Sequence, residues 1–209
     1  MSFGSVVALS RTTLHVAPGE SIAIMGPSGS GKTTLLRVLQ GLTPPSSGYA
    51  VVLGQNQGTA RKRERAELRR RRMGLISQNA DLLPEFSALE NVALPLLLDG
   101  ARRSEGLEAG RRALHRLGLG ERCDAHVASL SGGEAQRVAV ARAIVREDVE
   151  LVIADEPTAS LDVENAQAVT SDLLKHAADR RAALVLATHD PHVAKRCDRI
   201  VRISRGMEA

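Results

Sequence analysis

Hydrophobic residues occur along this chain in short unbroken runs and in longer segments of helical spacing. Residues 21–25, 151–154 and 183–187 are largely apolar without alternating polar positions, which is the pattern of parallel strands covered on both faces. Residues 49–53 form a similar run that stops at Gly54. The pattern therefore predicts four strands, three of them in a buried parallel sheet.

Helices are predicted between these strands. The helical segments are residues 33–40, 61–72, 88–118, 133–145 and 164–178. No strand is predicted between residues 88 and 146. We therefore expect an α/β fold whose core is formed by about residues 1–81 and 147–209, with an α-helical subdomain inserted at about residues 82–146.

Composition narrows the class of protein. A chain of 209 residues with 43% hydrophobic content buries one sizeable core but not two, so a single domain is expected. The aromatic residues are Phe3, Tyr49 and Phe86, which leaves no surface on which bases could stack. A protein that binds single-stranded nucleic acid is therefore not expected, although the net charge is +4.

The chain shows no sign of secretion, disulfide bonding or membrane insertion. Cys123 and Cys197 lack the spacing of a metal site or a disulfide framework, so both are expected to be reduced thiols. The longest apolar stretch, residues 92–98, is interrupted by Pro95 and is far shorter than the ~20 residues of a membrane span. We expect a soluble chain without a signal peptide.

A glycine-rich loop follows the first buried strand and precedes a helix. Residues 26–33 read GPSGSGKT, the P-loop pattern in the strand-to-helix context that it needs. Backbone N–H groups of such a loop converge on phosphate oxygens, Lys32 reaches the β- and γ-phosphates, and the Thr33 hydroxyl binds Mg²⁺. The predicted phosphate contacts are Gly26, Pro27, Ser28, Gly29, Ser30, Gly31, Lys32, Thr33 and Thr34. This loop alone leaves kinases, GTPases and motors open.

Two further buried strands end in residues that suit phosphate chemistry. Asp155 and Glu156 close one strand, where Asp155 can hold Mg²⁺ and Glu156 can accept a proton from the attacking water. His189 follows the other strand, and we expect it to orient or sense the γ-phosphate.

A second helix start is suited to binding an anion. Residues 130–137 read LSGGEAQR and open a helix with Ser131 and two glycines. Two phosphate-binding helix starts are unusual for one ATP. We infer that the second one completes the site of a partner subunit.

These motifs, in this order, resemble the ATP-binding-cassette (ABC) family over nearly the whole chain. The resemblance identifies GPSGSGKT as Walker A, Gln78 as the Q-loop glutamine, LSGGE as the signature, LVIADE as Walker B, residues 160–162 as the D-loop and His189 as the switch histidine. It implies a P-loop NTPase (RecA-like) core, ATP and Mg²⁺ as ligands, and a head-to-tail dimer with two ATP molecules at the interface.

The resemblance also implies the role of each site residue. The catalytic residues it implies are Glu156, His189 and Gln78, and the metal ligands are Thr33, Gln78 and Asp155. The partner's nucleotide contacts Ser131, Gly132, Gly133, Glu134 and Asp162. Phe3 stands at about the position of the aromatic residue that stacks on adenine, although the strand that usually precedes it has almost no counterpart here.

The segment after Gln78 resembles one branch of the family. Residues 74–78 and 82–92 look like the lipoprotein-release and macrolide-export ATPases. That similarity implies a membrane permease as partner and a peripheral location on the cytoplasmic face of a bacterial membrane. The arginine run at residues 69–72 could attract nucleic acid or lipid headgroups, but its glutamate neighbours favour a solvated helix face.

Two other functions compete with this interpretation. A soluble cassette ATPase acting on nucleic acid or ribosomes usually carries tandem cassettes or a long coiled coil, which 209 residues do not accommodate. A small-molecule P-loop kinase would leave the Ser131–Glu134 motif and the Asp155–Glu156 pair unexplained.

Overall fold

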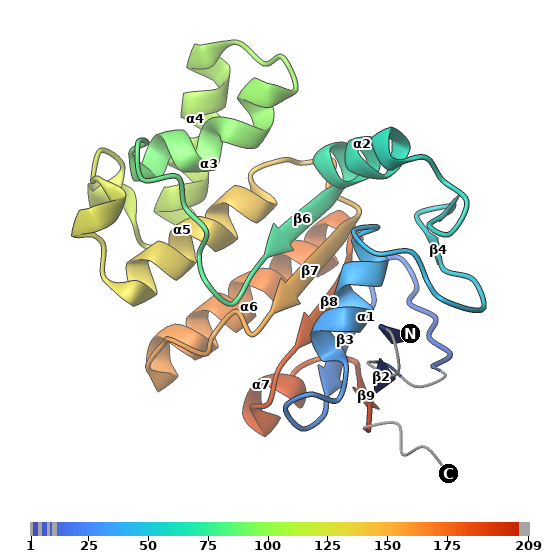
Figure 1. Cartoon of the computed structure of the whole chain (residues 1–209). Coiled ribbons are helices and arrows are strands. Elements are labelled where there is room, and N and C mark those ends of the chain that lie inside the picture. Colours follow the sequence, from blue (N-terminus) through green and yellow to red (C-terminus); the bar gives the residue numbers. More distant parts are fainter. Residues whose placement is uncertain (1, 4–5, 8, 10–11, 205–209) are drawn as a thin grey trace.

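The computed structural model describes residues 2–3, 6–7, 9 and 12–204 of the chain. Its centre is a five-stranded parallel sheet in the order β6-β7-β8-β3-β9 (Figure 1). The strands are β3 (Ser21–Met25), β6 (Met73–Ile76), β7 (Leu151–Asp155), β8 (Ala183–Ala187) and β9 (Arg199–Arg202). The sheet confirms the predicted α/β fold, and β6 and β9 are strands that the sequence pattern did not predict.

Two small antiparallel sheets accompany the central one. β1 (Ser2–Phe3) pairs with β2 (Val6–Val7), and β4 (Val51–Val52) pairs with β5 (Gln55–Asn56). Leu53 and Gly54 join β4 to β5 with φ angles of 49° and 82°, as a tight hairpin turn with two left-handed residues requires. The strand predicted at residues 49–53 is therefore shorter than expected.

The helices differ in two places from the predicted segments, and one of these is a short helix at residues 191–194 that was not predicted. They are α1 (Lys32–Leu39), α2 (Lys62–Arg72), α3 (Ala88–Leu98), α4 (Arg103–Arg116), α5 (Gly132–Ile144), α6 (Val163–Arg180) and α7 (Pro191–Ala194), with 3₁₀ turns at Gly120–Arg122 and Val127–Ser129. The single helical pattern predicted for residues 88–118 is two helices, because the chain turns at Gly100 with φ 94°.

The central sheet separates two layers of helices. Alternate residues of a strand point to opposite faces. On one face, Ile22, Ile24 and Ile153 pack in a cluster with residues of α1 and α2. On the other, Val152 and Ala154 pack in a cluster with residues of α5 and α6. Helix α1 and helix α5 therefore lie on opposite faces of the sheet, as Figure 1 shows.

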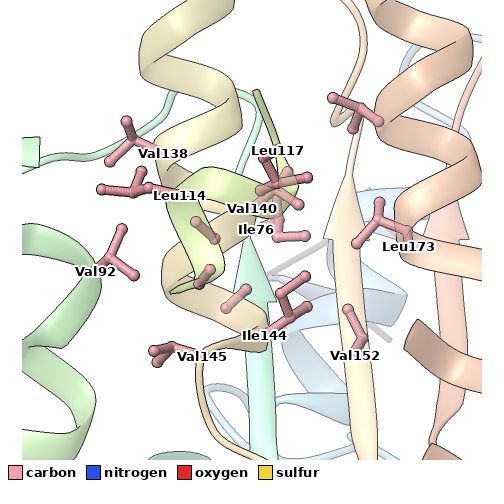
Figure 2. Packing of buried hydrophobic residues seen from close by; sticks show 14 of the residues in the cluster. Ile76, Val92, Leu114, Leu117, Val138, Val140, Ile144, Val145, Val152 and Leu173 are labelled. Carbon is pink, nitrogen blue, oxygen red and sulfur yellow. The ribbon is translucent and has the colours of Figure 1, made fainter. Parts of the chain in front are cut away.

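Helices α3 and α4 extend the second layer outward from α5. Figure 2 shows Val138, Val140 and Ile144 of α5 packed between the strands and the outer helices. Leu114 is completely buried in this cluster, so truncating it to alanine would cost about 2–5 kcal/mol. The subdomain boundaries predicted near residues 82 and 146 stay a prediction.

Helix α2 is not simply a solvated charged face. Arg69 donates to the Gln40 carbonyl oxygen at 3.0 Å, which satisfies a carbonyl group just past the last turn of α1. Arg72 pairs with Glu150. These arginines attach α2 to the core, and the helix predicted at residues 61–72 is present. Among the described residues, no helix has the length and hydropathy of a membrane span.

Asp99 joins α2 to the outer helices. It follows α3, and its carboxylate forms ion pairs with Arg70 and Arg71 of α2. Arg146, just past α5, also pairs with Asp99 at 2.9 Å and is itself mostly buried. The pairs with these arginines hold the pKa of Asp99 below its usual value, with Arg146 contributing most. The end of α5 is thus fixed to α2 and α3 at one point.

Candidate functional site

The glycine loop, Glu156, His189 and Gln78 gather at one edge of the central sheet. All five strands are parallel, so their carboxyl ends lie on the same side. The glycine loop follows β3, Glu156 follows β7, Thr188 and His189 follow β8, and Gln78 lies two residues past the end of β6. Segments far apart in the sequence therefore meet at the edge where open α/β sheets bind their ligands.

The glycine loop has a conformation that side chains would prevent. Gly29 and Gly31 have φ angles of 77° and 98°, in the region where glycine is favoured. A Cβ atom on Gly26 would lie 2.3 Å from the Ile203 carbonyl oxygen. The buried Ser30 Oγ has no partner in the described part of the chain. The loop is therefore a cradle of backbone groups ahead of α1, as phosphate binding requires.

Lys32 and Thr33 link the first turn of α1 to the neighbouring strand ends. Lys32 Nζ donates to the Gly26 carbonyl oxygen at 2.7 Å, so its charge lies over the loop. The Thr33 hydroxyl donates to Asp155 Oδ2 at 3.0 Å. Burial raises the pKa of Asp155 above its usual value, although the Thr33 hydrogen bond opposes that change. This hydroxyl and carboxylate are a donor set that suits Mg²⁺.

The raised pKa of Asp155 predicts a stability effect of unusual sign. A carboxyl group whose pKa is higher in the folded state than in the unfolded state stabilises the protein at low pH. That contribution is lost as pH rises from the unfolded pKa, near 3.8, through the folded pKa. At pH 7 in EDTA, the ionised Asp155 therefore destabilises the protein. We expect Asp155→Asn to raise the midpoint of thermal unfolding while it removes ATP hydrolysis.

Asp198 offers a matched control for this measurement. Its carboxylate accepts from the Ser21 backbone N–H at 2.8 Å and from the Ser21 hydroxyl at 2.7 Å, and these bonds lower its pKa. Its contribution is present above the unfolded pKa and is lost as pH falls through the folded one. Asp198→Asn should therefore lower the midpoint. Equal destabilisation by both substitutions would contradict the account of Asp155.

Glu156 and His189 are in direct contact. His189 Nδ1 lies 2.9 Å from Glu156 Oε2, and the His189 backbone N–H also faces that oxygen at 3.3 Å. The Glu156 side chain is 12% exposed and the His189 side chain is 71% exposed. Glu156 has φ 49°, a left-handed backbone that is rare outside glycine, and its N–H donates to the Ala187 carbonyl oxygen. The hydrogen bond to Ala187 holds this strained backbone beside the end of β8.

The signature residues lie away from this edge. Ser131 caps helix α5: its hydroxyl accepts from the Glu134 backbone N–H at 3.2 Å, and the Glu134 carboxylate accepts from the Ser131 backbone N–H at 2.8 Å. Ser131 and Gly132 are exposed, and Gly133 is half-buried. Because α5 packs on the face of the sheet opposite α1, these residues and the glycine loop do not form one site within a chain.

The remaining predicted residues are placed as follows. Asp162 caps α6, where its carboxylate accepts from the Asn165 backbone N–H at 2.8 Å. Phe3 lies in β1, but its side chain is outside the described residues. Pro27 and Ser28 are exposed on the loop, and Thr34 lies in the first turn of α1.

Two residues that the sequence did not single out contact this region. Gln136 and Arg142 of α5 donate to backbone carbonyl groups of the segment that carries Gln78. Their signal in the sequence is weak, since it consists only of long polar side chains on a helix that is otherwise largely buried.

Comparison with known proteins assigns the family. Residues 9–159 match the family model described as ABC transporter, which covers well over half of the chain. The chain belongs to the ABC transporter family. It is therefore an ATP-binding and ATP-hydrolysing cassette, as the resemblance of its motifs implied.

Two curated proteins that are similar to this ABC cassette carry the same name. It is 43% identical over 202 residues to the lipoprotein-releasing system ATP-binding protein LolD of Pseudomonas fluorescens, with 97% of this chain and 88% of that protein covered. It is 42% identical over 198 residues to the LolD protein of Shewanella sp. (strain MR-4), with 95% and 85% covered.

Solved structures agree with the fold. A dimeric ATP-binding cassette in a post-hydrolysis state bound to ADP and Pi has a TM-score of 0.91 and 30% identity, with 100% of this chain and 94% of that chain covered. A dimeric bacterial ABC transporter cassette has a TM-score of 0.90 and 32% identity, with 95% and 87% covered. The ABC cassette fold is thereby confirmed.

Proposed function

We propose that this cassette is the ATPase subunit of a bacterial lipoprotein-releasing type of complex, in which Glu156 is the general base. The observation that carries the proposal is the contact between Glu156 and His189 at the edge where the glycine loop ends. A carboxylate held by an imidazole can accept the proton of an attacking water while the imidazole fixes its position. Gln78 follows β6 at the same edge and would orient that water.

The same edge suits the phosphates of ATP. Backbone N–H groups of residues 28–34 would bind the β- and γ-phosphates, and Lys32 would move from the Gly26 carbonyl oxygen to them. Thr33 and Asp155 would hold Mg²⁺, together with Gln78, and this ion would neutralise charge that develops on the transferred phosphoryl group. The destabilising burial of the Asp155 carboxylate is what a cation would relieve.

A second copy of the chain would complete each site. Ser131, Gly132 and Gly133 open a helix that presents its N-terminus to solvent, on the opposite sheet face from α1. Val163 follows the D-loop residue Asp162 and is 75% exposed, which suits a face covered by a partner. We therefore propose a head-to-tail homodimer in which each ATP lies between one chain's glycine loop and the other chain's signature helix.

A membrane permease is the proposed partner beyond the dimer. The relatives named as lipoprotein-releasing ATP-binding proteins support this partner, and they do not favour a soluble ATPase acting on nucleic acid or ribosomes. We propose that the cassette binds at the cytoplasmic face of the cell membrane and contacts the permease through the segment after Gln78. Leu83 in that segment is 39% exposed.

Leu83 provides a test of the permease contact. Asn91 holds the Leu83 backbone on both sides, accepting from its N–H at 2.8 Å and donating to its carbonyl oxygen at 3.0 Å, so a substitution changes the side chain without releasing the loop. After detergent extraction, the amount of membrane partner that copurifies with tagged Leu83→Asp should be at least about tenfold lower than with the wild type. A loss of ~1.4 kcal/mol in binding free energy is a factor of ten in affinity.

The control is a second exposed apolar side chain. Tyr49 is 82% exposed and lies two residues before β4, and Tyr49→Asp should retain the partner. Figure 1 shows β4 on the other side of the molecule from α3. The retained proteins are identified by mass spectrometry. Recovery of ribosomes or DNA without an integral membrane protein would contradict the proposed function.

A further inference from the structure

The loop that carries Gln78 is tied to helix α5 by two polar side chains. Gln136 is 2% exposed and donates from Nε2 to the Ser77 carbonyl oxygen at 3.1 Å. Arg142 donates from its two terminal nitrogens to the carbonyl oxygens of residues 80 and 81, and both donor–acceptor distances are 2.8 Å. Three backbone groups of one short loop therefore depend on a single helix.

The loop is shaped to present those carbonyl groups. Ser77 Oγ donates to the Asn79 carbonyl oxygen at 2.7 Å and also contacts the Asp81 carboxylate. Asp81 has φ 47°, which is uncommon for a residue with a side chain. Strained backbone of this kind persists only where its surroundings fix it. The two bonds from Arg142 are part of those surroundings, while the Gln78 side chain stays exposed.

Helix α5 also lies unusually close to the strand from which the loop emerges. A Cβ atom on Gly74 of β6 would be 2.3 Å from the Ala143 carbonyl oxygen of α5. The absence of a side chain at this position lets the helix rest directly on the strand. Burial lowers the pKa of the Arg142 guanidinium, and its hydrogen bond to the Ala80 carbonyl oxygen is partly buried. Hydrogen bonds in such surroundings are stronger than those in water.

We propose that Gln136 and Arg142 are positioning residues that make two segments move together: the Gln78 loop, residues 77–81, and the signature helix, α5. The inference rests on the roles proposed above for Gln78 and Ser131. Ser131 begins the helix that would meet the partner's nucleotide, and Gln78 would lie beside the chain's own nucleotide. When the signature helix closes on the partner, the loop moves with it, so each chain readies its own site as it completes the other.

The main variant is Arg142→Met, which keeps the length of the side chain and removes its donors. We expect kcat for ATP to fall between about tenfold and a hundredfold, because small misplacement of a catalytic group costs this much. The ATP dissociation constant should stay within about twofold, since the glycine loop is untouched. Hydrogen exchange of the backbone amides at residues 77–81 should become faster in the same variant.

Arg146→Met is the matched control. Arg146 also lies near the end of α5 and is mostly buried, but it donates to Asp99 and Asp148 rather than to the loop. This variant can lose stability, yet its kcat and the exchange at residues 77–81 should stay within about twofold of the wild type at a temperature where both proteins are folded. Arg142→Lys, which restores one donor group, should recover part of kcat.

A second variant tests the role of the loop if Arg142→Met does not fold. Ser77→Ala removes the hydroxyl that closes the loop and leaves α5 intact, and we expect it to lower kcat by about threefold to tenfold with faster exchange at residues 78–81. Normal kcat in Arg142→Met or Ser77→Ala, despite faster exchange, would overturn the proposal. Equal loss in the Arg142 and Arg146 variants would also overturn it.

Failure of the inference is distinguishable from failure of the proposed function. If Glu156→Gln hydrolyses ATP normally, the proposed base is wrong, whatever the Arg142 variant does. If Glu156→Gln is inactive and forms an ATP-dependent dimer, but Arg142→Met has the wild-type kcat, only the coupling between loop and helix is refuted.

Discussion

Glu156→Gln should lower kcat for ATP hydrolysis by at least about 10²-fold, because the amide cannot accept the proton of the attacking water. The substitution keeps the size of the side chain and an oxygen that can face His189, which lies 2.9 Å from the carboxylate in the native protein. ATP binding should therefore be preserved. The ATP-bound dimer, which hydrolysis would otherwise dissociate, should therefore accumulate in the presence of ATP and Mg²⁺.

Phosphate release measures the first effect, and light scattering after size-exclusion chromatography measures the second. Glu67→Gln is the control, since Glu67 is an exposed residue of α2 paired with Arg71. It should leave kcat within about twofold, as surface substitutions commonly do. Wild-type hydrolysis by Glu156→Gln would remove Glu156 from the role of base.

A mixture of two inactive variants should regain activity if each site is shared between chains. Lys32→Ala disables the glycine loop, and Gly132→Asp places a carboxylate where the partner's phosphates would lie. A Cβ atom at Gly132 meets no atom within 4 Å, and an acidic residue in the first turn stabilises a helix, so this variant should fold. Equal amounts should give about a quarter of wild-type activity, because half of random dimers have one intact site of two.

The control mixture combines Lys32→Ala with Glu156→Gln. Both substitutions fall in the same half of a shared site, so their heterodimer has no intact site and should stay inactive. No recovery in the first mixture would mean that the glycine loop and the signature helix serve the same nucleotide within one chain. Recovery in the control mixture would mean that Lys32 and Glu156 of one chain serve different nucleotides. Either result would contradict the head-to-tail arrangement.

The buried strands and the phosphate chemistry could be predicted from the sequence because their causes are local. A strand covered on both faces must be apolar throughout, and β3, β7 and β8 lie within one residue of the predicted ranges. Phosphate binding requires glycines and a lysine at fixed spacing, and those residues follow β3 as the pattern required.

Features set by tertiary pairing could not be predicted in this way. β6 directly follows the basic helix α2 and contains Gly74, and the edge strand β9 carries an arginine at each end, so neither shows an unbroken run of strand-forming residues. Each becomes a strand by pairing with β7 or β3. The partners of Gln136 and Arg142 are backbone carbonyl groups, which have no sequence signature.

Helix α5 rests directly on the sheet near its C-terminal end, where the Ala143 carbonyl oxygen faces Gly74 of β6, while Ser131 and Gly132 at its start are exposed. The 12 residues from Ser131 to Ala143 extend about 18 Å along the helix, so a tilt of roughly 10° about that contact would move Ser131 by about 3 Å. In the proposed head-to-tail dimer, a small change in subunit packing would thus shift the signature residues by the span of one hydrogen bond at the partner's nucleotide.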